Sequence, residues 1–397
     1  MEEQQKQFKL SEVIILIVIT LIIGFIIGLS LFKVALEKKD IKTNNDQELK
    51  KFIDNYNYIV DNYYGELDKK ELIDKAISGM LESIDDPYTT YIDEESSNSF
   101  ATTLEGSFEG IGVEIVNDSD NNIVVYSVIK GSPAEKAGVE PLDIIKSING
   151  KNLENTETSE FVSIVKTSEN PVITLEIKRK DETITKEIKR EKVTITSVES
   201  EIFEKQNKKI GYMYISIFAN NTYSQFKKQL EELENKGIDS LIIDVRGNTG
   251  GHLTAVENIL SLFLDSSHII YQTEDKNGIE KTYSKGKETK QYKIVILTNK
   301  SSASASEILA ATMKEEYGAT LVGKATYGKG TVQELKTLPD GEQYKFTTKK
   351  WLTPKGNWIH EKGVEVDVDV EFNKDYYDNP THENDNQLQE AIKTILK

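Results

Sequence analysis

The sequence predicts an α/β protein in three parts: an N-terminal transmembrane helix, a small β-rich domain, and a mixed α/β core. Three observations lead to this prediction. Residues 13–32 form a run of twenty residues without a charge. Short β-rich runs such as IGVEIV and VITLEIKR crowd residues 105–190. Beyond them strands and helices alternate, which favours a substantially parallel sheet.

The length of 397 residues exceeds what one ordinary core supports. The composition shifts along the chain suggest five segments. They are a membrane anchor and linker (1–45), a helical segment (46–100), the β-rich domain (101–190), the α/β core (191–372) and a helical tail (373–397).

Composition excludes several functions. The net charge of −17 argues against a nucleic-acid ligand. The chain has no cysteine, so thiol nucleophiles and disulfides are excluded. Its four histidines show no H-E-x-x-H spacing, so we expect no metal site and no cofactor.

The apolar run Val13–Phe32 is long enough to cross a bilayer as a helix. A buried core helix is the alternative. No A-x-A-like cleavage site follows Phe32, which favours an uncleaved single-pass anchor. Residues 33–42 hold four lysines and residues 1–12 only two, so charge alone would keep the body in the cytoplasm.

Residues 46–83 carry two apolar stripes at helical spacing, and Asp86-Pro87 is expected to end this helical segment. Such helices can pack locally or on a second copy of the chain.

The β-rich domain contains three motifs in order. Glu109-Gly110-Ile111-Gly112-Val113 is followed by GSPAEKAG at residues 131–138 and by DII and ING at residues 143–150. Together they resemble a PDZ domain. The resemblance implies that Gly110, Ile111, Gly112 and Val113 bind the free carboxylate of a peptide tail, which would lie beside the loop as an added strand.

The stretch KIVILTNKSSASASEILAATM predicts a strand, a small-residue turn and a helix. Ser304 with Glu307 fits a capping box, so Ser304 could simply cap the helix. The same position suits a nucleophile, because the N–H of Ala305 at the helix start has no intrahelical partner and could stabilise an oxyanion.

Two further segments could complete a site. The turn DVRGNTGG (244–251) could be a tight β-to-α turn or could supply an oxyanion donor from Gly250 or Gly251. It lacks the spacing of a phosphate loop.

The second of these segments contains Lys329, which lies between glycines in TYGKGTVQ. Most lysines are solvated, but burial would lower the pKa of Lys329 and make it a usable base, with Gln333 as a hydrogen-bond partner.

These three segments resemble the carboxy-terminal processing, or tail-specific, proteases. The resemblance implies a Ser-Lys dyad in which the lysine comes twenty-five residues after the serine, which fits Ser304 and Lys329. It assigns Gln333 as the supporting glutamine and Gly250 with Ala305 as the oxyanion hole. A threonine, Thr249, stands where the family has a proline. The match extends to LESIDDPY (81–88), TPKG (353–356) and GVEVD (363–367).

The family resemblance implies a serine endopeptidase that recognises exposed C-terminal tails of protein substrates. It also implies a catalytic body outside the cytoplasm, against the lysine count, and a homodimer assembled through terminal regions.

Three alternatives remain at this point. One is an inactive, anchored PDZ scaffold, which both Ser304 and Lys329 argue against. A second is a penicillin-binding acyl enzyme, for which S-x-x-K occurs, as at residues 127–130, 163–166 and 224–227, but without a K-T-G box. The third is a Ser-His site that uses His252.

Overall fold

The computed structural model describes residues 47–92, 102–337 and 343–397. The chain divides into two compact units, Met1–Met80 and Leu81–Lys397. The apolar run Val13–Phe32 lies outside the described residues. Within the ranges given above, no helix is both long and apolar enough to span a bilayer.

Two helices represent the N-terminal helical segment, α2 (Gln47–Asn62) and α3 (Lys69–Glu82). The second ends at Glu82, before Asp86-Pro87, and Asp85 has a left-handed backbone with φ of 57°. The apolar stripe of α2 stays accessible. Phe52 is 41% exposed and Ile59 is 44% exposed.

The β-rich domain is an antiparallel sheet with two helices. Its strands are, in spatial order, β3 (Val113–Asn117), β4 (Ile123–Val128), β5 (Ile144–Ile148), β7 (Val172–Arg179) and β8 (Glu182–Lys189); β6 (Lys151–Asn152) pairs with β5. The helices are α5 (Pro133–Lys136) and α6 (Thr158–Thr167). Alternating side chains of these strands bury a separate apolar core around Ile123, Ile148 and Leu175. The strands β2 (Ser107–Gly110) and β9 (Glu191–Thr194) pair where the chain enters and leaves this domain.

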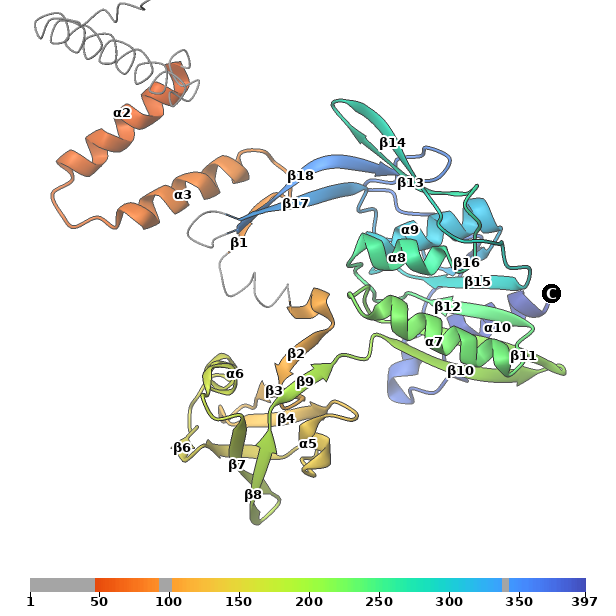
Figure 1. The fold of residues 1–397 in the computed structure, drawn as a ribbon, viewed down its shortest axis with the longest axis horizontal. Coiled ribbons are helices and arrows are strands. Elements are labelled where there is room, and N and C mark those ends of the chain that lie inside the picture. Colours follow the sequence, from red (N-terminus) through yellow and green to blue (C-terminus); the bar gives the residue numbers. More distant parts are fainter. Residues whose placement is uncertain (1–46, 93–101, 338–342) are drawn as a thin grey trace, which may run out of the picture. The chain divides into compact units, whose positions relative to one another are not determined.

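A six-stranded sheet forms the centre of the α/β core (Figure 1). In spatial order its strands are β10 (Val198–Lys205), β11 (Lys208–Ile215), β12 (Ser240–Asp244), β15 (Lys293–Thr298), β16 (Thr320–Gly323) and β19 (Val368–Asp369). Only the pairing of β10 with β11 is antiparallel among the described pairs of this sheet. The expected parallel α/β core is therefore confirmed.

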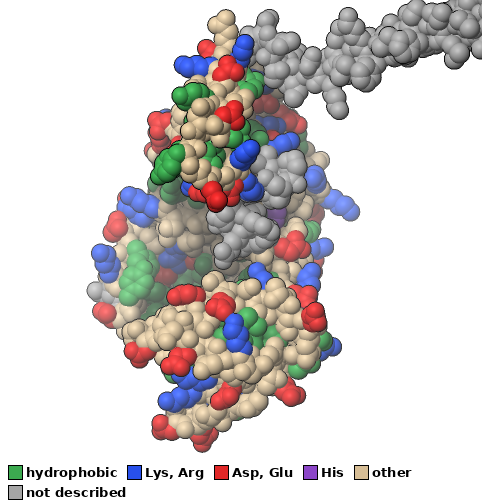
Figure 2. Space-filling view, turned by 90° about the vertical axis from the view of Figure 1, so that its left-hand side faces the viewer, with side chains coloured by type: hydrophobic (Ala, Val, Ile, Leu, Met, Phe, Trp, Pro, Cys, Tyr) green, Lys and Arg blue, Asp and Glu red, His purple; other side chains and the backbone are tan. Residues whose placement is uncertain are grey.

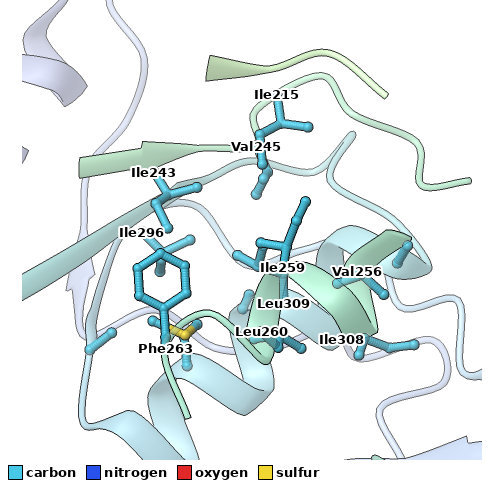
Figure 3. Close-up of a cluster of buried hydrophobic side chains, with 14 of the residues drawn as sticks. Ile215, Ile243, Val245, Val256, Ile259, Leu260, Phe263, Ile296, Ile308 and Leu309 are labelled. Atoms are coloured by element: carbon cyan, nitrogen blue, oxygen red, sulfur yellow. The ribbon is translucent and has the colours of Figure 1, made fainter. Parts of the chain in front are cut away.

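Helices cover both faces of this sheet. One face packs against α7 (Thr222–Asn235), α8 (Leu253–Leu260) and α9 (Ala305–Thr312). Figure 3 shows this contact, with Ile243 and Ile296 of the sheet close to Ile259 and Phe263. The other face packs against α10 (Asn386–Leu396), which follows the 3₁₀-helical turn η3 (Lys374–Asp378). Burial on both faces explains why β12 and β15 are continuous apolar runs.

Two helices of the core end in turns that are not α-helical. Helix α8 ends at Leu260, and the N–H groups of Leu262 and Phe263 then bond three residues back and tighten the last turn. Helix α9 gives way at Met313 to the π-helical turn η2 (Met313–Tyr317), which stops at Gly318 with φ of 82°.

A second sheet lies against the core. It contains β1 (Thr90–Ile92), β18 (Gln343–Leu352), β13 (Ile269–Asp275) and β14 (Gly278–Tyr283) in spatial order, with β17 (Thr331–Thr337) also paired to β18. Its strand β1 comes from the segment before the β-rich domain, so residues far apart in sequence meet here. On the face shown in Figure 2, acidic and basic side chains are interspersed.

Candidate active site

Three turns leave the carboxyl edge of the central sheet. A glycine turn (residues 245–251) follows β12, a serine turn (residues 299–304) follows β15, and a lysine loop (residues 324–330) follows β16. These strands are parallel neighbours. Parallel strands carry their carboxyl ends to one edge, so the topology places all three turns side by side.

Ser304 has an unusual backbone. Its φ of 56° and ψ of −114° lie outside the regions favoured by residues with a Cβ. Such strain persists only where the surroundings hold it, and it is typical of a nucleophile exposed on a sharp strand-to-helix turn. The side chain is half-buried at the N-terminus of α9.

Glu307 connects the serine turn to the lysine loop. Its carboxylate is fully buried and accepts hydrogen bonds from the N–H of Ser304 at 2.8 Å, Gly328 at 2.6 Å and Lys329 at 2.9 Å, and from the Thr326 hydroxyl at 2.7 Å. The amides of Ser304 and Lys329 bind the same oxygen, Oε2, so these two backbones are adjacent. Burial raises the pKa of Glu307, and the four hydrogen bonds oppose that rise. The sequence predicted this residue only as part of a capping box.

Lys329 is half-buried beside this carboxylate. Desolvation lowers the pKa of its amine, the positive charge of Lys345 lowers it further, and Glu307 acts in the opposite direction. No hydrogen bond between the Lys329 amine and the Ser304 hydroxyl is present among the described residues. The two predicted dyad members are thus neighbours through their backbones rather than through a direct side-chain bond.

Gln333 lies on β17, next to a bulge between Val332 and Gln333. Its amide donates to the hydroxyl of Thr331 at 2.9 Å and to that of Thr347 at 3.1 Å. In the described part of the chain it makes no bond to Lys329. Support of the amine by Gln333 therefore stays a prediction.

The glycine turn packs against the serine turn. A Cβ on Gly250 would lie 2.9 Å from the Ser304 Cβ and 3.1 Å from the Ala305 nitrogen, and its φ is 111°, so glycine is required. The N–H of Gly250 donates to the Asn248 side chain at 2.8 Å. The N–H groups of Ala305 and Gly251 have no partner within the ranges that the structure describes. The oxyanion role of Ala305 stays a prediction that this geometry allows, whereas the N–H of Gly250 could take such a role only after releasing the Asn248 side chain.

Asn248 was missed as a site residue by sequence reasoning. It is fully buried, and its amide donates to the Ile215 carbonyl at 2.9 Å. Its own carbonyl accepts from the Ala303 N–H at 3.0 Å and the Ser306 hydroxyl at 2.8 Å. These bonds fix the distance between the glycine and serine turns. A polar residue within the turn that follows a buried strand is the signal that could have indicated this role.

The glycine turn is also tied to the C-terminal tail. The partly buried Arg246 guanidinium contacts Asp244 at 2.6 Å and Asp385 at 2.7 Å, and it donates to Gln387 at 3.1 Å. Bidentate arginine–carboxylate pairing fixes geometry as well as charge. Helix α10 therefore helps to hold the turn that carries Gly250.

His252 lies at the N-terminus of α8 and is half-buried. Its backbone N–H donates to the Phe218 carbonyl at 2.6 Å. Across the described residues, its imidazole makes no hydrogen bond to Ser304. The structure therefore gives a Ser-His pair no geometric support.

The predicted tail-binding loop joins β2 to β3, with Gly110 at the end of one strand and Val113 at the start of the next. The N–H groups of Ile111 and Gly112 have no hydrogen-bond partner in the residues that are described. Gly112 has a φ of 85°, and a Cβ there would clash with Ser132. The loop thus offers adjacent backbone donors in a shape that requires glycine.

The carbonyl groups of this loop accept hydrogen bonds from the rest of the PDZ-like domain. The Ile111 carbonyl accepts from the Ala134 N–H at 2.8 Å, and the Gly112 carbonyl accepts from the Ile129 N–H at 3.0 Å. Strand β3 is an edge strand of its sheet, and α6 lies against it. An edge strand next to a helix is the arrangement that accepts a peptide as an added strand.

Comparison with known families gives three matches along the chain. Residues 209–370 match the peptidase family S41, residues 124–179 match the PDZ domain, and residues 30–96 match the N-terminal domain of the activating protease CtpB. The β-rich domain is therefore a PDZ domain.

Individual relatives of this chain point to the same family. The carboxy-terminal processing proteases CtpA and CtpB of Bacillus subtilis (strain 168) are each 38% identical to this chain. The matches cover 83% and 84% of this chain and 70% of each relative. The solved photosystem II D1 C-terminal processing protease is 26% identical with a TM-score of 0.50, covering 78% of this chain and 84% of its own. These findings confirm the family resemblance, and this chain belongs to the S41 family of PDZ-containing, carboxy-terminal processing serine peptidases.

Proposed function

We propose that this chain is a membrane-anchored endopeptidase that cleaves protein substrates with a Ser304–Lys329 dyad after binding their free C-terminal tails. One observation carries the assignment of the dyad. The buried Glu307 carboxylate binds the backbone N–H groups of both residues, so the strained serine and the partly desolvated lysine share one site.

In the proposed mechanism, Ser304 Oγ attacks the substrate carbonyl and neutral Lys329 takes the hydroxyl proton. The Ala305 N–H and a donor from the glycine turn stabilise the oxyanion. The protonated lysine then gives its proton to the leaving amine, and water hydrolyses the acyl enzyme by the same sequence. The lowered pKa of Lys329 favours the neutral amine that the first step needs.

Tail recognition rests on the PDZ domain. The N–H groups of Ile111 and Gly112, which have no partner among the described residues, can bind a terminal carboxylate, and the outer edge of β3, the last described strand on that side of its sheet, can pair with the residues before it. Val116 and Val162 are 44% and 39% exposed and offer apolar contacts on β3 and α6. We infer a preference for tails with an apolar terminal residue.

Cleavage and its substrates can be tested together. Membranes that carry the active enzyme are compared with membranes that carry Ser304→Ala, and protein termini are identified by mass spectrometry. The proposal requires new termini that depend on Ser304 and lie near the C-termini of substrates. Termini that persist in the Ser304→Ala sample would contradict it.

The proposed location is the outer face of the cell membrane, with Val13–Phe32 as a single span. Because the chain has no cysteine, an introduced thiol reports topology cleanly. Lys287→Cys, at an exposed position, should react with an impermeant maleimide on intact cells, and Gln4→Cys should react only after lysis. The reverse pattern would place the body in the cytoplasm.

A homodimer is part of the proposal. The exposed apolar stripe of α2, which includes Phe52 and Ile59, suits a contact with a second copy. Light scattering should show a dimer that Phe52→Ser with Ile59→Ser converts to a monomer. A monomeric parent protein would remove this part of the proposal.

A further inference from the structure

The segment before β1 reaches the candidate site, although the sequence assigned it no function. Asp86 accepts hydrogen bonds from the Thr89 hydroxyl at 2.7 Å and the Tyr88 N–H at 3.0 Å. The N–H of Thr347 on β18 donates to the Thr89 hydroxyl at 3.1 Å. The hydroxyl of Thr347 also receives the amide of Gln333. These bonds fix the turn that carries Tyr88 to the strand beside the lysine loop.

Tyr88 lies directly against the candidate base. The Lys329 Nζ is 5.1 Å from the centre of the Tyr88 ring. The ring also meets the His360 imidazole edge-on at 6.2 Å, and its hydroxyl interacts with Tyr327. The ring is therefore held from two sides while one face is turned to the amine.

We propose that Tyr88 is a positioning residue whose ring holds the Lys329 amine at the site. The proposal rests on the dyad proposed above. The lysine side chain is a flexible four-carbon stem, and no hydrogen bond in the described part of the chain joins its amine to Ser304 or Gln333. The contact with the Tyr88 ring is thus one constraint on the position of Nζ in this structure.

The ring acts differently on the two forms of the amine. The face of an aromatic ring attracts an ammonium group, and this attraction strengthens as water is excluded. Burial acts against the ammonium and lowers the pKa of Lys329. The ring therefore offsets part of the decrease that desolvation causes in the pKa of Lys329. The titratable groups around the amine are Glu307 on α9, Asp86 and Tyr88 before β1, Tyr327 in the lysine loop, Lys345 on β18, and His360.

Two variants separate this role from packing. Tyr88→Phe keeps the ring and loses the hydroxyl, whereas Tyr88→Leu keeps an apolar side chain and loses the aromatic face. Tyr283→Leu, on the exposed end of β14, is the matched control. Loss of the aromatic attraction destabilises the ammonium, so the pKa of Lys329 should fall in Tyr88→Leu by about 0.5–1.5 units.

The test has two readouts on the full-length chain. The first is the pH profile of kcat/KM. The second is the pH midpoint for modification of Lys329 by an amine-reactive reagent, followed by mass spectrometry in a Ser304→Ala background. Tyr88→Leu should move both to lower pH, while Tyr88→Phe and Tyr283→Leu should leave both unchanged. A modification midpoint that stays in place or moves upward in Tyr88→Leu overturns the proposal.

The two proposals fail in different ways. Full activity of Lys329→Ala would contradict the proposed dyad. The pH midpoint for modification of Lys329 does not depend on catalysis, so it would still test the role of Tyr88. An unmoved midpoint together with inactive Lys329→Ala would leave the dyad intact and remove the role of Tyr88.

Discussion

The turns of the α/β core and the loop of the PDZ domain use glycine for a similar geometric reason but treat their backbone N–H groups differently. Gly250 and Gly112 both have positive φ and both lie where a Cβ would contact a neighbouring residue. In the core, the N–H of Gly250 bonds Asn248 and that of Ser304 bonds Glu307. In the PDZ loop, the N–H groups of Ile111 and Gly112 have no partner within the described ranges.

This difference follows from what each site must do. In the proposed mechanism the core turns hold a strained serine beside a lysine, and internal hydrogen bonds of most of their N–H groups would fix that arrangement. In the proposed tail binding the PDZ loop takes a charged group from outside, for which its N–H groups would have to stay available while its carbonyls hold the loop in place. Perturbation of the core should therefore destroy turnover, and perturbation of the loop should change affinity.

The largest effect is expected from the dyad. Ser304→Ala and Lys329→Ala should each lower turnover by about ten thousand-fold or more, and the double variant should be no worse, because the two residues act as a unit. Cleavage of a peptide with a free C-terminus, measured beside thermal unfolding, checks this. Measurable turnover by a folded Lys329→Ala protein would rule out the lysine as the base.

A smaller but still large effect is expected at Glu307, which tests whether internal hydrogen bonds define the core site. In Glu307→Gln the amide NH₂ faces backbone donors, so charged hydrogen bonds worth about 1.5–3 kcal/mol each are lost. Turnover should fall by roughly a hundredfold because Ser304 and Lys329 shift. The control is Glu390→Gln on α10, where Glu390 forms an ion pair with the exposed Lys393. This variant should change neither turnover nor the unfolding temperature. Wild-type turnover in Glu307→Gln would contradict this account.

The PDZ loop should respond in affinity instead. A peptide with a free, apolar C-terminus should bind the full-length Ser304→Ala protein about 10–100-fold more tightly than its amidated form, because the loop donors lose a charged acceptor. Gly112→Ala should weaken binding, since its Cβ would meet Ser132, whereas Gly131→Ala, also at positive φ but with open space, should not. Equal affinities for both peptides in calorimetry would remove tail sensing.

The comparison also shows what the sequence could predict. Apolar runs and glycine turns predicted β12, β15, α9 and the PDZ sheet, because burial on both faces leaves a local signal. The second sheet was not identified. Its strands β17 and β18 are only partly buried, and β1 joins them from more than 250 residues away in sequence. Long-range pairing of this kind leaves no short periodic pattern.

The residues of the candidate site also fall into those with a local sequence signal and those without one. Ser304, Lys329 and Gly250 lie in small-residue turns that made them candidates, and the family resemblance then assigned their roles. Asn248 and Tyr88 were not, since their roles depend on contacts with other segments. The expected bond from Gln333 to Lys329 is not present among the described residues, because the amide faces Thr331 and Thr347 instead.

The smallest effect is expected at His252, and it tests whether desolvation of Lys329 sets the pH dependence. The proposed mechanism requires a neutral Lys329 amine, and burial lowers the pKa of this group. Activity should therefore be low in acid and rise with pH through a single ionisation below the ordinary lysine value of about 10.4. His252 lies at the start of α8 and, in the described part of the chain, has no bond to Ser304. His252→Ala should leave the position of the acid limb unchanged in a pH series of kcat/KM. If this limb disappears in His252→Ala, a histidine is the proton acceptor and the assignment of Lys329 is wrong.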